Sequence, residues 1–225
     1  NQFKGTVVGI TGSNGKTTVK EWMAQCAPHD AKIFRSPRSY NSQIGVPLSV
    51  WQLRKESTLG IFEAGISQSR EMERLQQIIK PTIGIITNIS NAHQENFNTA
   101  EEKCCEKLSL FKECDVIIYN ADNNILADAV GSMLLPARKI AWSQKNPERP
   151  LYIYSIEKDG QGTTIRYQYL NIRDSYRIPF LDEASVEDSI NCLAAALYLM
   201  IPPEKIAERM AQLEPVAMRL EVKEG

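Results

Sequence analysis

The sequence contains no long apolar run, no excess of acidic or basic residues, and no cysteines at CxxC spacing. No apolar run approaches the roughly 20 residues that a membrane span requires. Lys and Arg total 26 against 27 Asp and Glu, which gives no electrostatic reason to expect nucleic acid or an anionic membrane as a partner. The five cysteines are scattered and show no CxxC spacing, so they favour reduced thiols in a cytoplasmic protein.

An initiator methionine and a signal-like segment are also absent. "NQFKGTVVGIT" reaches its first predicted strand within a few residues, and the sequence stops at "RLEVKEG". We therefore expect residues 1–225 to form one domain of a longer protein, with material missing on both sides.

What is present over the first two thirds is an alternation of apolar runs with helical patterns. Strands are predicted at 6–11, 31–34, 58–64, 82–89, 115–120 and 139–143. Helices are predicted at about 15–27, 46–53, 69–80, 99–112 and 123–130. Continuous apolar strands that alternate with helices predict an α/β fold, with a mostly parallel sheet flanked by helices.

The pattern changes at about residue 150. Residues 150–180 are rich in Tyr, Ile and Thr and contain a glycine turn at 160–162, which predicts a small antiparallel β meander appended to the domain. Helical patterns follow at 184–201 and 203–213. We expect the meander to have a structural role.

A glycine-rich segment joins the first predicted strand to the first helix. It reads Gly12, Ser13, Asn14, Gly15, Lys16, Thr17, Thr18. A strand–glycine turn–helix unit directs backbone N–H groups and a helix dipole at one point, which suits phosphate. Lys16 would then bind the β- and γ-phosphates and Thr17 would bind Mg²⁺. The spacing is GxxGKT, shorter than GxxxxGK[ST], and the alternative is a tight turn with a surface lysine.

Two further polar residues follow predicted strands. Glu63 ends the strand that begins at residue 58, at the edge where a parallel sheet binds its ligands, and a carboxylate there can hold Mg²⁺. The alternative is a solvated strand-end glutamate. His93 follows the strand at 82–89 in the same way, although a histidine in a polar loop is more often a surface residue.

Lys107 has an unusual place in its predicted helix. Cys104, Leu108 and Phe111 form an apolar stripe, and Lys107 falls at its edge. Burial would lower its proton affinity and leave a neutral amine for chemistry. The alternative is a lysine that extends along the helix to solvent.

Together these segments resemble the Mur ligases and their folylpolyglutamate synthase relatives. "GITGSNGKTT" resembles the ATP loop of that family. The segments 40–53 ("YNSQIGVPLSVWQL"), 61–97 and 215–221 ("PVAMRLE") resemble three further family motifs in the same order. The resemblance implies a central ATPase domain with a P-loop NTPase-like fold, flanked by an N-terminal UDP-substrate domain and a C-terminal domain.

The resemblance also implies roles for the metal-site residues. Lys107, four residues before Phe111, matches a lysine that CO₂ carbamylates, and this group and His93 would hold a second Mg²⁺. The family's K-G-E pattern reads Lys-Leu-Ser at 107–109, and Lys103 is a competing choice.

Three nucleotide contacts are implied as well. Asn120 in "YNADN" matches a turn near the nucleotide, although an Asx turn has the same residue preferences. Asn191 matches an asparagine that faces the adenine, but the family's preceding His-Asn pair reads Glu-Asp at 187–188. Arg219 matches an arginine that reaches the ATP phosphates or ribose.

By resemblance, the activity is an ATP-dependent amide ligation through an acyl phosphate. "IGVPL" with "ITNI-x-x-AH" resembles the branch that joins D-alanyl-D-alanine to UDP-MurNAc-tripeptide in peptidoglycan synthesis, and a fusion to alanine racemase is one variant. The alternatives are a folylpolyglutamate synthase or another muramyl amino-acid ligase, or an isolated module that binds ATP without catalysis. A GTPase-like switch would require an NKxD motif, and "NADN" lacks its lysine.

Overall fold

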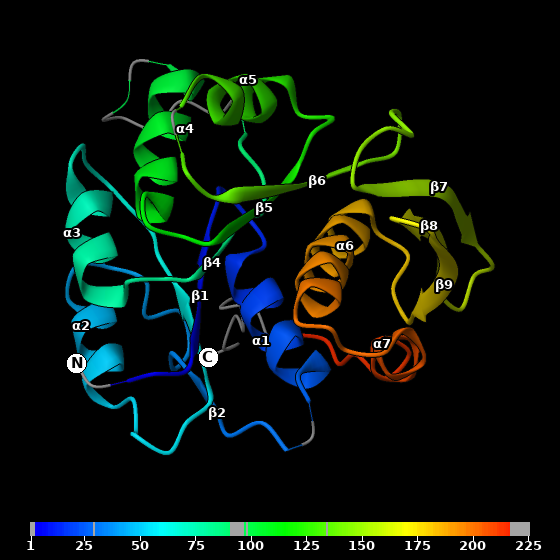
Figure 1. Ribbon diagram of the computed structural model, residues 1–225, viewed down its shortest axis with the longest axis horizontal. Helices are drawn as coiled ribbons and strands as arrows, with labels where there is room; N and C mark the ends of the chain where they lie inside the picture. The colour runs from blue at the N-terminus through cyan, green and yellow to red at the C-terminus, as the bar shows by residue number, and fades with distance from the viewer. Residues whose placement is uncertain (1–2, 29, 91–96, 98, 134, 217–225) are drawn as a thin grey trace, which may run out of the picture.

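The computed structural model describes residues 3–28, 30–90, 97, 99–133 and 135–216 (Figure 1). Its strands are β1 (Thr6–Thr11), β2 (Ile33–Arg35), β3 (Leu59–Glu63), β4 (Ile83–Ile86), β5 (Val116–Asn120), β6 (Arg138–Ser143), β7 (Leu151–Lys158), β8 (Thr163–Tyr169) and β9 (Ile172–Ile178). Its helices are α1 (Lys16–Cys26), α2 (Gly45–Trp51), α3 (Glu71–Ile79), α4 (Ala100–Leu108) with a 3₁₀ turn at Ser109–Phe111, α5 (Asn124–Ser132), α6 (Glu183–Tyr198) and α7 (Pro203–Met210).

The nine strands of the described residues form one sheet, in the order β2-β3-β1-β4-β5-β6-β7-β8-β9. The pairings from β2 to β7 are parallel, and those of β7 with β8 and β8 with β9 are antiparallel. The predicted parallel sheet with an antiparallel meander is therefore confirmed. The meander continues the sheet, because β7 pairs with β6 through Trp142 with Leu151 and Ser143 with Tyr152.

Helices cover both faces of the sheet, so the parallel strands are apolar on both sides. In β5, Val116 and Ile118 belong to one core cluster, whereas Ile117 and Tyr119 belong to the other. Alternate side chains of a strand point to opposite faces, and both faces here are buried. Figure 1 shows α1 and α6 on one side of these strands and α2 to α5 on the other.

The parallel pairing brings the carboxyl ends of β1, β3, β4 and β5 to one edge. Ile10 of β1 pairs with Glu63 of β3, and Thr11 pairs with Ile86 of β4. The segments that follow these strands therefore emerge side by side, where open α/β sheets bind ligands. This edge contains the candidate site.

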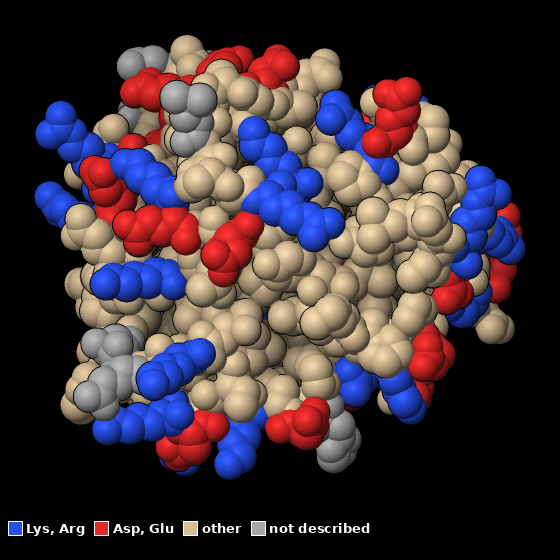
Figure 2. Space-filling view, viewed as in Figure 1, with Lys and Arg blue, Asp and Glu red and all other residues tan. Residues whose placement is uncertain are grey.

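The charged side chains on the surface agree with the balanced number of acidic and basic residues in the sequence. On the face shown in Figure 2, basic and acidic side chains are interspersed, and a largely uncharged area lies to the right of and below the centre. All five cysteines are free, and only Cys105 is exposed. No helix in the described part of the chain is long and apolar enough to cross a bilayer.

Candidate active site

The glycine-rich loop (residues 12–15) lies between β1 and α1 and has a shape that only glycine permits at two positions. Gly12 has φ 142°, and a Cβ there would lie 1.9 Å from Oγ1 of Thr87. Gly15 has φ 78° and caps α1, and its Cβ would lie 2.2 Å from Oδ1 of Asp188. Side chains at either position would be both strained and in collision.

The segment after β4 fixes this loop from the side. The Ser13 N–H donates to the Asn88 carbonyl (2.9 Å), and the Asn14 N–H donates to Asn88 Oδ1 (3.0 Å). The Thr87 hydroxyl donates to the Asn14 carbonyl, and the Ser90 N–H donates to the Ser13 hydroxyl at 3.1 Å. In the sequence this segment is part of "ITNI-x-x-AH", and its support of the loop depends on the parallel pairing of β1 with β4.

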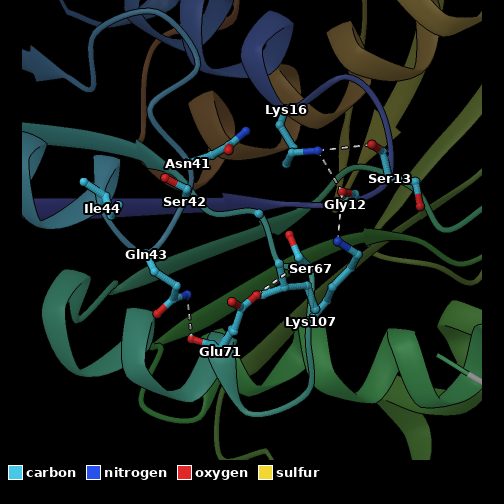
Figure 3. A pocket seen from close by; sticks show the side chains of 12 residues that line it. Gly12, Ser13, Lys16, Asn41, Ser42, Gln43, Ile44, Ser67, Glu71 and Lys107 are labelled. Carbon is cyan, nitrogen blue, oxygen red and sulfur yellow. Dashed lines mark hydrogen bonds between the residues drawn. The ribbon is translucent and has the colours of Figure 1, made fainter. Parts of the chain in front are cut away.

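Two lysines converge on the loop. Lys16 Nζ donates to the carbonyls of Gly12 (3.0 Å) and Ser13 (3.1 Å), and Lys107 Nζ donates to the same Gly12 carbonyl at 3.2 Å (Figure 3). These residues line a cavity of about 360 Å³. Its remaining lining comes from residues 41–44 after β2, 65–67 after β3 and Glu71 of α3.

Lys107 is buried at the edge of the apolar stripe that the sequence predicts. Cys104, Leu108 and Phe111 are fully buried, and Lys107 is 3% exposed. Burial, together with the charges of Lys16 and Lys103, lowers the pKa of Lys107 to about 7. Near neutral pH a substantial share of this amine is therefore unprotonated and nucleophilic.

Lys16 also loses proton affinity in this environment. Burial lowers its pKa, the nearby Glu63 carboxylate opposes the change, and Lys103 adds to it. Three lysines thus gather at one end of the sheet, which makes the cavity suitable for an anion with several charges.

Thr17 and Glu63 meet beside the loop. The Thr17 hydroxyl donates to Glu63 Oε2 at 2.8 Å, and Glu63 is fully buried. Burial raises the pKa of Glu63, while Lys20, Thr17 and Lys16 lower it and Glu21 raises it further.

These oxygens fit a magnesium ion. Glu63 Oε1 is buried and has no hydrogen-bond partner in the described structure. Hydroxyl and carboxylate oxygens are ligands that Mg²⁺ accepts alongside phosphate and water. Among the described residues no three His, Cys, Asp or Glu side chains cluster in a metal-binding arrangement.

Two sequence-predicted site residues, His93 and Arg219, lie outside the described residues, so their roles stay predictions. Thr18 lies in the first turn of α1, next to Thr17.

A second polar cavity of about 330 Å³ lies at the ends of β5 and β6. Its lining consists of Asn88, Asn120, Asp122, Asn123, Gln144, Lys145 and Glu187. Asn120 Oδ1 accepts the Asp122 N–H at 2.9 Å, which is the Asx turn considered as the alternative, and Asn120 also lines this cavity. Its contact with a nucleotide stays a prediction. Asn88 connects this cavity to the glycine-rich loop.

Asn191 does not line that cavity. It is fully buried on α6, and its Oδ1 accepts the Trp142 Nε1–H at 2.9 Å. Glu187, one helical turn earlier, lines the cavity instead. The base contact expected of Asn191 stays a prediction.

Sequence reasoning missed two buried charged residues beside the site. Asp188 lies against Gly15, and burial, together with Glu187 and Asp182, raises its pKa to about 7. Lys20 is fully buried on α1 and forms an ion pair with Glu63 at 3.9 Å. Its spacing of one helical turn from Lys16 was the available signal.

Comparison with known proteins identifies the family of this chain. The family model for the Mur ligase middle domain matches residues 10–199. The UDP-N-acetylmuramoyl-tripeptide–D-alanyl-D-alanine ligase of Bacillus subtilis is 28% identical over 96% of this chain and 46% of its own length. The ligase of the same name from Borreliella burgdorferi is 30% identical over 91% of this chain and 44% of its own.

Solved structures show the same fold. MurF from Acinetobacter baumannii superposes with a TM-score of 0.85 at 24% identity, covering 96% of this chain and 47% of that one. MurF from Thermotoga maritima in complex with ADP gives 0.82 at 21%, covering 95% and 49%. A mutant FPGS from L. casei gives 0.69 at 13%, covering 96% and 67%.

The family model covers most of the chain, and the chain spans about half the length of the curated relatives it matches. The chain therefore belongs to the Mur ligase family, of which it contains the middle domain.

Proposed function

We propose that this chain is the central domain of an ATP-dependent amide ligase. ATP phosphorylates a substrate carboxylate to an acyl phosphate, and an incoming amine displaces phosphate to form the amide. The observation that carries this proposal is the convergence of Lys16, Lys107 and the Thr17–Glu63 pair beside the glycine-rich loop. Such a site positions phosphoryl groups and neutralises their charge, which is the main task in phosphoryl transfer.

The loop and α1 are the proposed binding site for the ATP phosphates. Backbone N–H groups at the start of α1 and the positive end of its dipole attract phosphate oxygens. Lys16 Nζ would exchange the carbonyls of Gly12 and Ser13 for oxygens of the β- and γ-phosphates. Thr17 and Glu63 would hold Mg²⁺, which when bound neutralises charge on the transferring phosphoryl group. Arg219 would add a further charge at the phosphates or ribose.

Lys107 is the proposed site of carbamylation. Its neutral amine would attack CO₂, form an N–C bond and release a proton, which leaves a carboxylate in place of a cation. The lowered pKa of Lys107 supports this step, since only the unprotonated amine is nucleophilic. The carbamate and His93 would then hold a second Mg²⁺.

The second cavity is the proposed binding site for the adenosine. Asn120 is one of its lining residues, and Asn88 connects it to the glycine-rich loop. The contact of Asn191 with the adenine stays a prediction, because its hydrogen bond in the described structure is with the Trp142 indole.

For the substrates we propose UDP-MurNAc-tripeptide and D-alanyl-D-alanine, in peptidoglycan precursor synthesis in the cytoplasm. The names of the curated relatives support this choice over folate or another muramyl peptide. The chain spans 46% of the length of one such relative, so we assign the activity to a full-length protein with flanking domains that bring the substrates to the cavity.

The deciding experiment is a phosphate-release assay on the full-length protein with two substrate pairs. UDP-MurNAc-tripeptide plus D-alanyl-D-alanine is expected to release phosphate in the presence of Mg²⁺ and ATP, and dihydrofolate plus glutamate is not. Release only with the folate pair would overturn the substrate choice. Failure of every Mur-ligase substrate to release phosphate, with ATP still bound, would leave an ATP-binding module and overturn the ligase activity.

A further inference from the structure

Lys20 is a fully buried lysine that the reaction described above does not use. It lies one turn after Lys16 on α1. Its Nζ donates to the carbonyl of Ser36 at 2.9 Å and to the carbonyl of Arg38. The same atom lies 3.3 Å from Glu21 Oε1 and 3.9 Å from Glu63 Oε1.

The carbonyls that Lys20 binds belong to a strained turn, residues 36–41. Arg38 has φ 49°, a left-handed conformation that a residue with a side chain adopts only when its surroundings enforce it. The turn is attached to β3 and its extension, since the Ser36 N–H donates to the Ile61 carbonyl (2.9 Å) and the Gly65 N–H donates to the Asn41 carbonyl (2.7 Å).

This turn leads directly into the wall of the cavity beside the glycine-rich loop. Asn41 and Ser42 line that cavity opposite Lys16 and Lys107 (Figure 3). The ammonium of Lys20 therefore supports, from inside the protein, the backbone that presents these two side chains.

The Lys20 ammonium also attracts the Glu63 carboxylate by its charge, at 3.9 Å, but it does not donate a hydrogen bond to it. An ammonium has three hydrogens, and the oxygens of Ser36, Arg38 and Glu21 are all nearer to it than Glu63. Glu63 Oε1 consequently lacks a hydrogen bond in the described structure, and Oε2 accepts from Thr17. The carboxylate is held in orientation with one oxygen left for a cation.

We propose that Lys20 is a positioning residue. It links the magnesium-binding carboxylate of Glu63 to the 36–41 turn, which leads into the cavity wall formed by Asn41 and Ser42. Through this link, the geometry of the metal site and that of the wall depend on one side chain. The inference rests on the proposed function, because it assigns Glu63 to Mg²⁺.

The test compares Lys20→Gln and Lys20→Met in the full-length protein. Gln keeps an N–H donor for the turn carbonyls but removes the charge that faces Glu63, whereas Met removes both. Lys112→Met is the matched control, since Lys112 is an exposed lysine paired with Glu73 at 2.7 Å. Calorimetry measures the Kd of ATP with Mg²⁺ and with EDTA. It also gives the Mg²⁺ concentration at which half of the Mg²⁺-dependent gain in ATP affinity is reached, called here the half-restoring concentration.

We expect Lys20→Gln to raise the half-restoring Mg²⁺ concentration about tenfold, as removal of a supporting residue behind a metal ligand does. Its Kd for ATP in EDTA should stay within about twofold of the wild type, because the Lys20 ammonium contacts Ser36, Arg38 and two carboxylates rather than the loop. Lys20→Met should show the same loss and also a higher KM for the peptide substrate, since the turn is released. Lys112→Met should match the wild type.

Wild-type Mg²⁺ dependence in Lys20→Gln would overturn the proposal, and so would an equal loss of ATP affinity with and without Mg²⁺, which indicates general damage. If Lys20→Met fails to fold, the Gln variant still decides the metal link. A wild-type protein that binds no ATP under either condition would instead contradict the proposed function, so the two failures are distinguishable.

Discussion

At the scale of the residue, Asp188 is a carboxyl group whose burial disfavours its charged form. Its carboxyl group packs against Gly15 at the start of α1 and is 6% exposed. Burial, with Glu187 and Asp182 adding to it, raises its pKa to about 7. A group whose pKa is higher in the folded than in the unfolded state makes folding bind protons, so its ionisation reduces stability.

We expect the free energy of unfolding to decrease as pH rises from about 4, where the unfolded side chain ionises, to about 7, where the folded one does. Below about pH 4 Asp188 is protonated in both the folded and the unfolded state, and above about pH 7 the decrease in the free energy of unfolding is complete. Asp188→Asn keeps the shape without the charge, and should be more stable than the wild type at pH 8 by on the order of 2–4 kcal/mol. Urea unfolding from pH 4 to pH 8 measures this, with Asp128→Asn on the exposed face of α5 as the control. Parallel pH curves for wild type and Asp188→Asn would contradict the argument.

Lys107 gives the second prediction at this scale. Because its pKa is about 7, we expect added bicarbonate to increase turnover of the full-length protein more at pH 6 than at pH 8, where carbamate forms readily. Lys107→Ala should lose activity by about 100-fold or more, as expected for a metal-ligand residue, and bicarbonate should not restore it. Lys112→Ala is the control in the same phosphate-release assay. Full turnover by Lys107→Ala would exclude the carbamate.

These residues differ in how far the sequence could reveal them. The helical spacing of Cys104, Leu108 and Phe111 placed Lys107 at the edge of a buried stripe, and the structure agrees. Lys20 has only its spacing of one helical turn from Lys16 as a local signal, and this spacing does not indicate burial. Its burial depends on contact with residues 36–38, which are distant in the sequence. Asn191 was expected at the base, but its contact with Trp142 depends on how α6 packs on β6.

At the scale of the element, the glycine-rich loop and the segment after β4 act as one unit. Gly12 approaches Thr87 so closely that a methyl group cannot fit without displacing that hydroxyl from the Asn14 carbonyl. The φ of 142° at Gly12 adds backbone strain for any other residue.

Gly12→Ala should therefore destabilise the domain by on the order of 1–3 kcal/mol and abolish measurable ATP binding. Gly131→Ala is the matched control, because it lies in α5 and its added Cβ meets nothing within 4 Å. That substitution should stabilise by roughly 0.5–1 kcal/mol, since alanine favours the helix. Urea unfolding and calorimetric titration with ATP measure both effects. Normal ATP affinity in Gly12→Ala would show that the loop does not contact phosphate.

The order of elements was predictable, whereas their connection across the sheet was not. Apolar runs and helical spacing follow from local burial, so the alternation through β6 agrees with the structure. The join of the meander to the main sheet depends on two residue pairs between β6 and β7, which no local pattern encodes. The sequence therefore predicted an appendage, and the structure has a continuous sheet.

At the scale of the whole molecule, the site and the meander share one core. The buried cluster on the α1 side of the sheet contains Val8 of β1, Trp142 of β6 and Tyr176 of β9. The Trp22 indole N–H also donates to the Glu214 carbonyl, which connects α1 to the segment after α7. We therefore expect residues 1–225 to unfold in a single cooperative transition.

Nucleotide binding should stabilise that whole unit. A ligand that binds only the folded state at 100 times its Kd adds about 2.7 kcal/mol. For a domain of this size the added free energy corresponds to a rise in Tm of roughly 5–10 °C. We expect a nonhydrolysable ATP analogue with Mg²⁺ to move one transition by this amount in residues 1–225, with Lys16→Ala losing the shift and Lys112→Ala keeping it. Differential scanning calorimetry, followed in parallel by tryptophan fluorescence, measures it. Two transitions, of which the analogue moves only one, would mean that β7–β9 fold independently of the nucleotide site despite the shared sheet.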